Sequence, residues 1–108
     1  MMATVTRLGA EKPVVIFTKS SCCMSHTIET LIRSYGADPR VYELDQIPNG
    51  QQMERELREL MKRKPSVPAV FIGNELIGGD KEVMSLHVQG ELPTLLIKAQ
   101  AIWVWRNN

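Results

Sequence analysis

Two short runs of β-branched and aromatic residues, separated by one amphipathic helix, constrain the fold of this chain more than any other feature. The run VVIFT (14–18) is typical of a buried strand, and VYEL (41–44) alternates with period two like a second strand. Between them, apolar residues recur at i, i+3, i+4 and i+7 from Ile28, which predicts a helix over residues 23–35. This unit predicts two parallel strands joined by a right-handed crossover.

The middle of the chain predicts a second helix followed by a hairpin. Residues 48–64 carry an apolar stripe at helical spacing, and Pro65 is expected to end that helix. PAVFI (68–72) and ELI (75–77) are strand-like and flank Gly73-Asn74, which is a tight-turn signal. An antiparallel pair is therefore expected after the parallel one.

The ends of the chain complete the predicted domain. Residues 1–12 are mixed and mostly polar, and are expected to form a flexible leader before a single domain over 13–108. Helices are expected over about 81–88, with Asp80 as a candidate cap, and over about 92–104. The order βαβαββαα predicts an α/β fold with a central four-stranded mixed sheet flanked by helices.

Charge and cysteine content argue against several classes of function. A net charge of +1 gives no reason to expect nucleic-acid binding or a membrane surface. No apolar run reaches the roughly 18 residues of a spanning helix, and the first 13 residues lack the apolar stretch of a secretory signal. The only two cysteines are neighbours, so they cannot form a disulfide framework. A reducing compartment is expected, the cytoplasm or the nucleus, with thiols free for chemistry.

Cys22 lies where the first predicted strand gives way to the first predicted helix. The first amides of a helix have no internal partners and the helix dipole is positive there, so a thiolate at this place is stabilised. Such a cysteine, with its pKa lowered from about 8.5, is both a nucleophile and a leaving group. The competing interpretation is that Cys22 and Cys23 are buried and inert. The position at the junction favours thiol chemistry for Cys22.

Ser25 stands where a dithiol motif would place its second sulfur. Serine cannot resolve a mixed disulfide, but it can donate a hydrogen bond to a Cys22 thiolate or cap the helix, and the two roles are compatible. This favours a catalytic cycle that an external thiol completes. For Cys23, packing, a secondary thiol and a site of further oxidation all stay open.

The chain resembles a glutaredoxin from Pro13 to about Trp103. The resemblance rests on VVIFTKSSC, on SVPAVFIG and on a Gly-Gly pair that opens a later helix. CCMS, within TKSSCCMSHTI, together with VYELDQIP and EVMSLH, resembles the plant CC-type glutaredoxins (class III, ROXY-like). The resemblance implies a thioredoxin-like fold and a glutathione-disulfide oxidoreductase in which Cys22 attacks glutathione mixed disulfides.

The resemblance also implies a groove for glutathione. Lys19 is expected to meet the glycyl carboxylate and Met24 to flank the sulfur. A cis bond between Val67 and Pro68 would turn the Val67 backbone outward to pair with the tripeptide like an added strand. A solvated Lys19 and a trans Pro68 are the plainer alternatives.

The last part of the groove is expected at a helix start. There the amides of Gly79 and Asp80 can hold the γ-glutamyl carboxylate. The Asp80 side chain brings an unhelpful negative charge, which Lys81 compensates. The alternative is that Gly78-Gly79 is a plain turn.

The C-terminal end holds candidates for protein binding. The resemblance implies that CC-type members use this end to bind TGA-type basic leucine zipper transcription factors, although Val104 stands where many have leucine. The alternative for the leucines is the core face of the last helix. The candidate partner-binding residues are Leu92, Leu95, Leu96 and Trp103.

Three functions stay open at this level. The first is a monothiol oxidoreductase acting on glutathionylated proteins. The second is a homodimer in which Cys22 of each copy and two glutathione thiols bind one [2Fe–2S] cluster. The third is a non-catalytic partner of transcription factors. Without a cluster the protein is expected to be a monomer.

Overall fold

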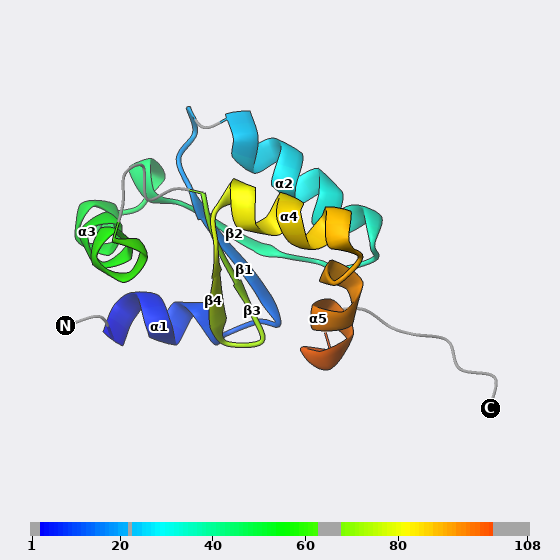
Figure 1. Cartoon of the computed structure of the whole chain (residues 1–108). Helices are drawn as coiled ribbons and strands as arrows, with labels where there is room; N and C mark the ends of the chain where they lie inside the picture. Colours follow the sequence, from blue (N-terminus) through cyan, green and yellow to red (C-terminus); the bar gives the residue numbers. More distant parts are fainter. Residues whose placement is uncertain (1–2, 22, 63–67, 101–108) are drawn as a thin grey trace.

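The computed structural model describes residues 3–21, 23–62 and 68–100, and contains a four-stranded sheet with helices on both faces (Figure 1). The central strand pairs in parallel with the second strand and antiparallel with the third, which pairs antiparallel with the fourth. The strands are β1 (Val14–Thr18), β2 (Arg40–Glu43), β3 (Ala69–Ile72) and β4 (Glu75–Gly78). Their spatial order β2-β1-β3-β4 confirms the predicted mixed, thioredoxin-like sheet.

The helices divide between the two faces of this sheet (Figure 1). Helices α2 (Cys23–Ser34), α4 (Asp80–Gln89) and α5 (Leu92–Lys98) supply one buried cluster, while α1 (Ala3–Gly9) and α3 (Gly50–Met61) supply the other. A short 3-10 turn, η1 (Leu44–Gln46), follows β2. None of the helices in the described ranges is long and apolar enough to cross a membrane.

Alternation along β1 separates the two clusters. All five residues of this strand are buried. Val14 and Ile16 join the cluster under α2, α4 and α5, whereas Val15 and Phe17 join the one under α1 and α3. The ring of Phe17 also stacks on Tyr42, with centroids 5.5 Å apart. The two central strands, β1 and β3, are thus buried on both sides, whereas β2 and β4 are partly exposed.

The N-terminal residues differ from the predicted loose leader. Residues 3–9 form α1, and Val5 is fully buried in the second cluster. The buried carboxylate of Glu56, on α3, accepts a hydrogen bond from the Val5 amide at 3.1 Å. Gly9 lies so close to Phe71 that a Cβ there would be 2.7 Å from the ring. One apolar side chain, one capping carboxylate and one glycine fix this helix on the domain.

Several element boundaries also differ from the predicted ones. Helix α3 ends at Met61, before Pro65, because Lys62 adopts a left-handed conformation (φ 56°) and its amide donates to the Arg58 carbonyl at 2.7 Å. Helix α4 begins at Asp80 with Gly79 as its N-cap, so the expectation that Asp80 caps the helix is wrong. Helix α5 ends at Lys98, and the rest of the predicted helix from residue 101 lies outside the described residues.

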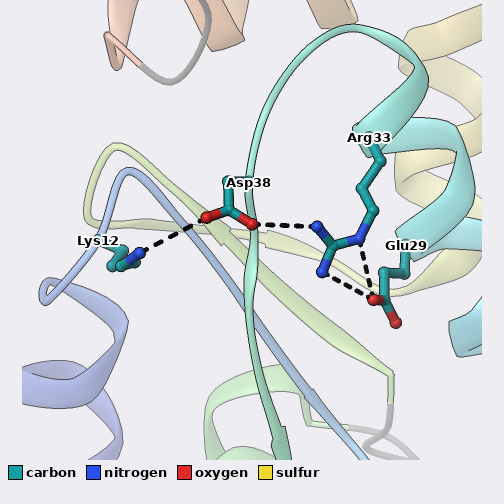
Figure 2. Close-up of polar contacts among 4 residues, drawn as sticks. All are labelled: Lys12, Glu29, Arg33 and Asp38. Carbon is teal, nitrogen blue, oxygen red and sulfur yellow. Dashed lines mark hydrogen bonds and ion pairs between the residues drawn. The ribbon is translucent and has the colours of Figure 1, made fainter.

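Asp38 links the crossover to the entrance of β1 (Figure 2). Its two carboxylate oxygens lie 3.0 Å from Arg33 Nη1 and 3.8 Å from Lys12 Nζ. Arg33 also pairs with Glu29 one helical turn earlier, at 3.0 Å. This network ties α2, the α2–β2 connection and the segment before β1 together at the surface.

Candidate functional site

Strand register brings the predicted site segments to one end of the sheet, where several strands begin or finish. Phe17 pairs with Ala69, so the end of β1 lies beside the start of β3. Val70 pairs with Gly78, so the end of β4 reaches the same end of the sheet. Lys19, Pro68 and Gly79 follow or precede these strand ends directly. Three predicted segments, distant in sequence, therefore converge at one end of the sheet.

The turn after β1 is fastened to the segment after β2. The Ser20 amide donates to Asp45 Oδ1 at 3.1 Å, and the Ser20 hydroxyl lies 3.1 Å from carboxylate oxygens of both Asp45 and Glu43. Gln46 Nε2 donates to the Ser20 hydroxyl at 3.1 Å. Because β1 and β2 are parallel, their carboxyl ends meet here. This polar cluster positions the turn that leads to Cys22.

The Ser20 amide also changes the acidity of Asp45. Its hydrogen bond favours the charged carboxylate and holds the pKa of Asp45 below the ordinary value of 3.8, against a smaller opposing effect of burial. Hydrogen bonds from the Ser20 hydroxyl add to the lowering. Asp45 is therefore a fixed negative charge at the edge of the site at neutral pH.

The first turn of α2 carries three of the predicted residues. Cys23 is an exposed free thiol, so the interpretation of Cys23 as a buried residue is wrong. Met24 is also exposed, at 39%, whereas Ser25 is buried at 8%. Cys22 lies outside the described residues, and the predicted hydrogen bond between it and Ser25 stays a prediction.

Lys19 is held by an internal carboxylate. Its Nζ lies 2.7 Å from Glu54 Oε2 on the first half of α3, and both side chains are partly buried. The alternative of a freely solvated Lys19 therefore does not describe this structure. The pair lines a pocket of about 490 Å³ between the end of β1, η1 and α3. Its other lining residues are Leu44, Asp45, Ile47, Pro48 and Gln51.

Gly50 permits the close packing of one wall of this pocket. A Cβ at Gly50 would lie 1.6 Å from the carbonyl oxygen of Leu44, which is far inside van der Waals contact. The start of α3 therefore lies directly against η1. This approach places Gln51 and Glu54 beside the end of β1.

The start of α4 presents backbone donors at the same end of the sheet. Gly79 is buried, and its amide donates to Glu82 Oε1 at 2.8 Å, as in a capping box. Asp80 is half-buried and Lys81 is exposed. The amides of Asp80 and Lys81 belong to the first turn of the helix, where no helical carbonyl precedes them. An incoming carboxylate would meet these amides rather than the one already bound by Glu82.

The expected cis bond lies at the edge of the described residues. Pro68 is buried and directly precedes β3, which begins at Ala69, one residue later than predicted. Val67 lies outside the described residues, so its bond to Pro68 and its role toward the tripeptide stay predictions.

The C-terminal leucines correct one prediction. Leu92 and Leu96 are completely buried in the cluster under α2 and α4, so their side chains cannot meet a partner directly. Leu95 is half-buried and packs against the same cluster. The alternative that these leucines form the core face of the last helix describes the structure, because they pack α5 against the buried cluster. Trp103 lies outside the described residues.

Sequence reasoning missed the acidic side of the pocket. Asp45 and Glu54 contact Ser20 and Lys19 respectively, and neither was among the predicted site residues. The signal for Asp45 was available, since it follows the strand that runs parallel to β1. Glu54 lies in a helical stretch rich in charged residues, where the sequence indicates an exposed side chain. Only the close packing of α3 against η1 brings it to Lys19.

Comparisons with known proteins agree with the observed fold. The glutaredoxin family model matches residues 14–77. Monothiol glutaredoxin-S6 and monothiol glutaredoxin-S1 of Arabidopsis thaliana are 57% and 55% identical to this chain, in each case over 95% of this chain and 100% of the relative. A crystal structure of a buckwheat glutaredoxin–glutathione complex superposes with a TM-score of 0.88 at 31% identity, covering 94% of this chain and 92% of that one. This chain therefore belongs to the glutaredoxin family and, within it, to the plant CC-type class.

Proposed function

We propose that this protein is a glutathione-dependent thiol–disulfide oxidoreductase that acts on glutathione mixed disulfides by a monothiol mechanism. The observation that carries the proposal is the convergence of Lys19, Pro68 and Gly79 at the end of the sheet where α2 begins. An ammonium group and helix-start amides at that end suit the two carboxylates of a tripeptide. The solved relative named as a glutathione complex supports the choice of ligand.

The proposed cycle has two exchanges. The Cys22 thiolate attacks the glutathione sulfur of a protein mixed disulfide, the old S–S bond breaks, and the protein thiolate leaves and takes up a proton. Cys22 is then linked to glutathione. The thiolate of a second glutathione attacks that glutathione sulfur and releases oxidised glutathione and the Cys22 thiolate. The protein sulfur is reduced, the sulfur of the second glutathione is oxidised in its place, and Cys22 is regenerated.

The residues around the turn position the reacting sulfur and are not themselves oxidised or reduced. The Ser20–Asp45 hydrogen bonds hold the chain immediately before Cys22. The first turn of α2 supplies amides that stabilise a thiolate. Ser25, which has no sulfur, cannot compete with the second glutathione.

The test is a comparison of two single-cysteine variants. Cys22→Ser should abolish reduction of a glutathionylated small thiol, whereas Cys23→Ser should retain a large fraction of the wild-type rate. The rate is measured as NADPH consumption coupled to glutathione reductase. Equal losses in both variants would reject the assignment of roles. A wild-type protein with no turnover would reject the proposed function.

Three finer predictions concern an iron–sulfur cluster, protein partners and location in the cell. The chain has two cysteines, so it cannot supply the four thiolates of a [2Fe–2S] cluster by itself and would need glutathione and a second copy. Regulation of transcription factors, and the location in cytoplasm and nucleus, likewise stay predictions. Anaerobic reconstitution followed by visible absorption tests for the cluster. A chain lacking residues 101–108 tests the second prediction, because it should no longer bind a TGA-type transcription factor.

A further inference from the structure

The residue expected to recognise the glycyl carboxylate already has a carboxylate partner. Lys19 Nζ and Glu54 Oε2 are 2.7 Å apart, with 35% and 21% of the two side chains exposed. This is the distance of a charge-assisted hydrogen bond. A ligand carboxylate that approaches Lys19 therefore meets an ammonium group that already donates one of its three N–H groups to Glu54, and whose charge Glu54 offsets.

The charges around the pocket strengthen this effect. Among the side chains that line it, Asp45 and Glu54 are acidic and Lys19 is basic. Asp45 is charged at neutral pH, and the hydrogen bonds from Ser20 lower its pKa further. The lining thus carries one more negative than positive charge, which disfavours an anionic ligand.

We infer that Glu54 is a specificity-determining residue that competes internally with the glycyl carboxylate of glutathione for Lys19. The inference rests on the proposed function, because it assumes that glutathione is the ligand. When the tripeptide binds, either the Glu54 side chain rotates away and its ion pair with Lys19 is lost, or two carboxylates share the one ammonium group. Both arrangements weaken binding. The protein then takes glutathione less tightly than an otherwise equal site with a neutral side chain at this position.

The inference predicts a gain of affinity from removing one charge. In Glu54→Gln the side chain keeps its size but no longer neutralises Lys19. The probe is S-methylglutathione, whose blocked sulfur cannot react, so that affinity is measured by NMR titration without turnover. Because pairs of this exposure contribute modestly, we expect about two- to fivefold tighter binding than in the wild type.

A chemical control identifies the carboxylate concerned. The glycinamide form of S-methylglutathione lacks the charge that would compete with Glu54. Its affinity should change little in Glu54→Gln. Equal tightening for the acid and the amide would overturn the inference, because it would show an effect that does not pass through the glycyl carboxylate.

Two variants complete the design. Glu59→Gln removes the same charge from an exposed position of α3, and should leave the affinity for the acid unchanged. In a Lys19→Met background, Glu54→Gln should lose most of its effect. If wild type binds S-methylglutathione and Glu54→Gln binds it equally or more weakly, the inference fails while the proposed function stands. If no variant binds it, both fail.

Discussion

Asp45 positions the turn before Cys22 but takes no part in the proposed thiol–disulfide exchange. Its carboxylate accepts from both the amide and the hydroxyl of Ser20, two residues before Cys22. The same hydrogen bonds lower the pKa of Asp45. The turn before the predicted nucleophile therefore depends on a charge carried by another strand end.

Replacing Asp45 with asparagine should lower the melting temperature by a few degrees at pH 7. The folded-state pKa lies below the ordinary value of 3.8, so the charged carboxylate stabilises the fold above that value. The difference between wild type and Asp45→Asn should shrink as the pH falls below about 3.8 and vanish below the folded-state pKa. Thermal denaturation at several pH values measures it, with the exposed Glu91→Gln as control. A difference that does not depend on pH would contradict this role.

At the scale of elements, helix α1 is the clearest departure from the sequence-based prediction. Seven residues of mixed polarity give a weak periodic signal, and isolated helices this short are not stable in water. Tertiary contacts decide the outcome, through Val5 in the core and the Glu56 carboxylate on the Val5 amide. By contrast, β1 was predicted with its observed bounds because a run of β-branched residues allows few alternatives.

Val5→Ala should reduce the free energy of unfolding by about 1–3 kcal/mol, because it removes fully buried methyl groups and leaves a cavity. Thr6→Ala, on the exposed side of the same helix, should change it by less than about 0.5 kcal/mol. Urea denaturation measures both. If the two variants have equal stability, the N-terminal residues contribute as a loose leader would, and the packing of α1 described above is contradicted.

At the scale of the whole molecule, the two buried clusters lie on opposite faces of the sheet, and β1 and β3 contribute alternate residues to each. The order of elements predicted helices on the faces of a mixed sheet. The resemblance to glutaredoxins implied that the segments of Lys19, Pro68 and Gly79 contribute to one groove. The sequence did not predict the Lys19–Glu54 pair or the burial of Leu92 and Leu96 away from partners. Those depend on how closely helices approach, which a periodic pattern does not specify.

The two clusters should respond independently to small changes. Ile28→Val, on the face of α2, should cost about 0.5–1.5 kcal/mol, and Leu57→Ala, on the face of α3, about 2–5 kcal/mol. The double variant should cost their sum within about 0.5 kcal/mol, because the sites share no partner. Denaturant unfolding followed by circular dichroism measures all three. A clear deviation from the sum would show that strain passes through the sheet.

The contact between Gly50 and the Leu44 carbonyl has a consequence for how this protein can diverge. No side chain, however small, fits between the two backbones, so position 50 admits one amino acid unless the neighbouring turn is rebuilt at the same time. A change at position 50 is therefore tolerated only together with a change in the path of the Leu44 turn, so the two segments are expected to vary as one unit.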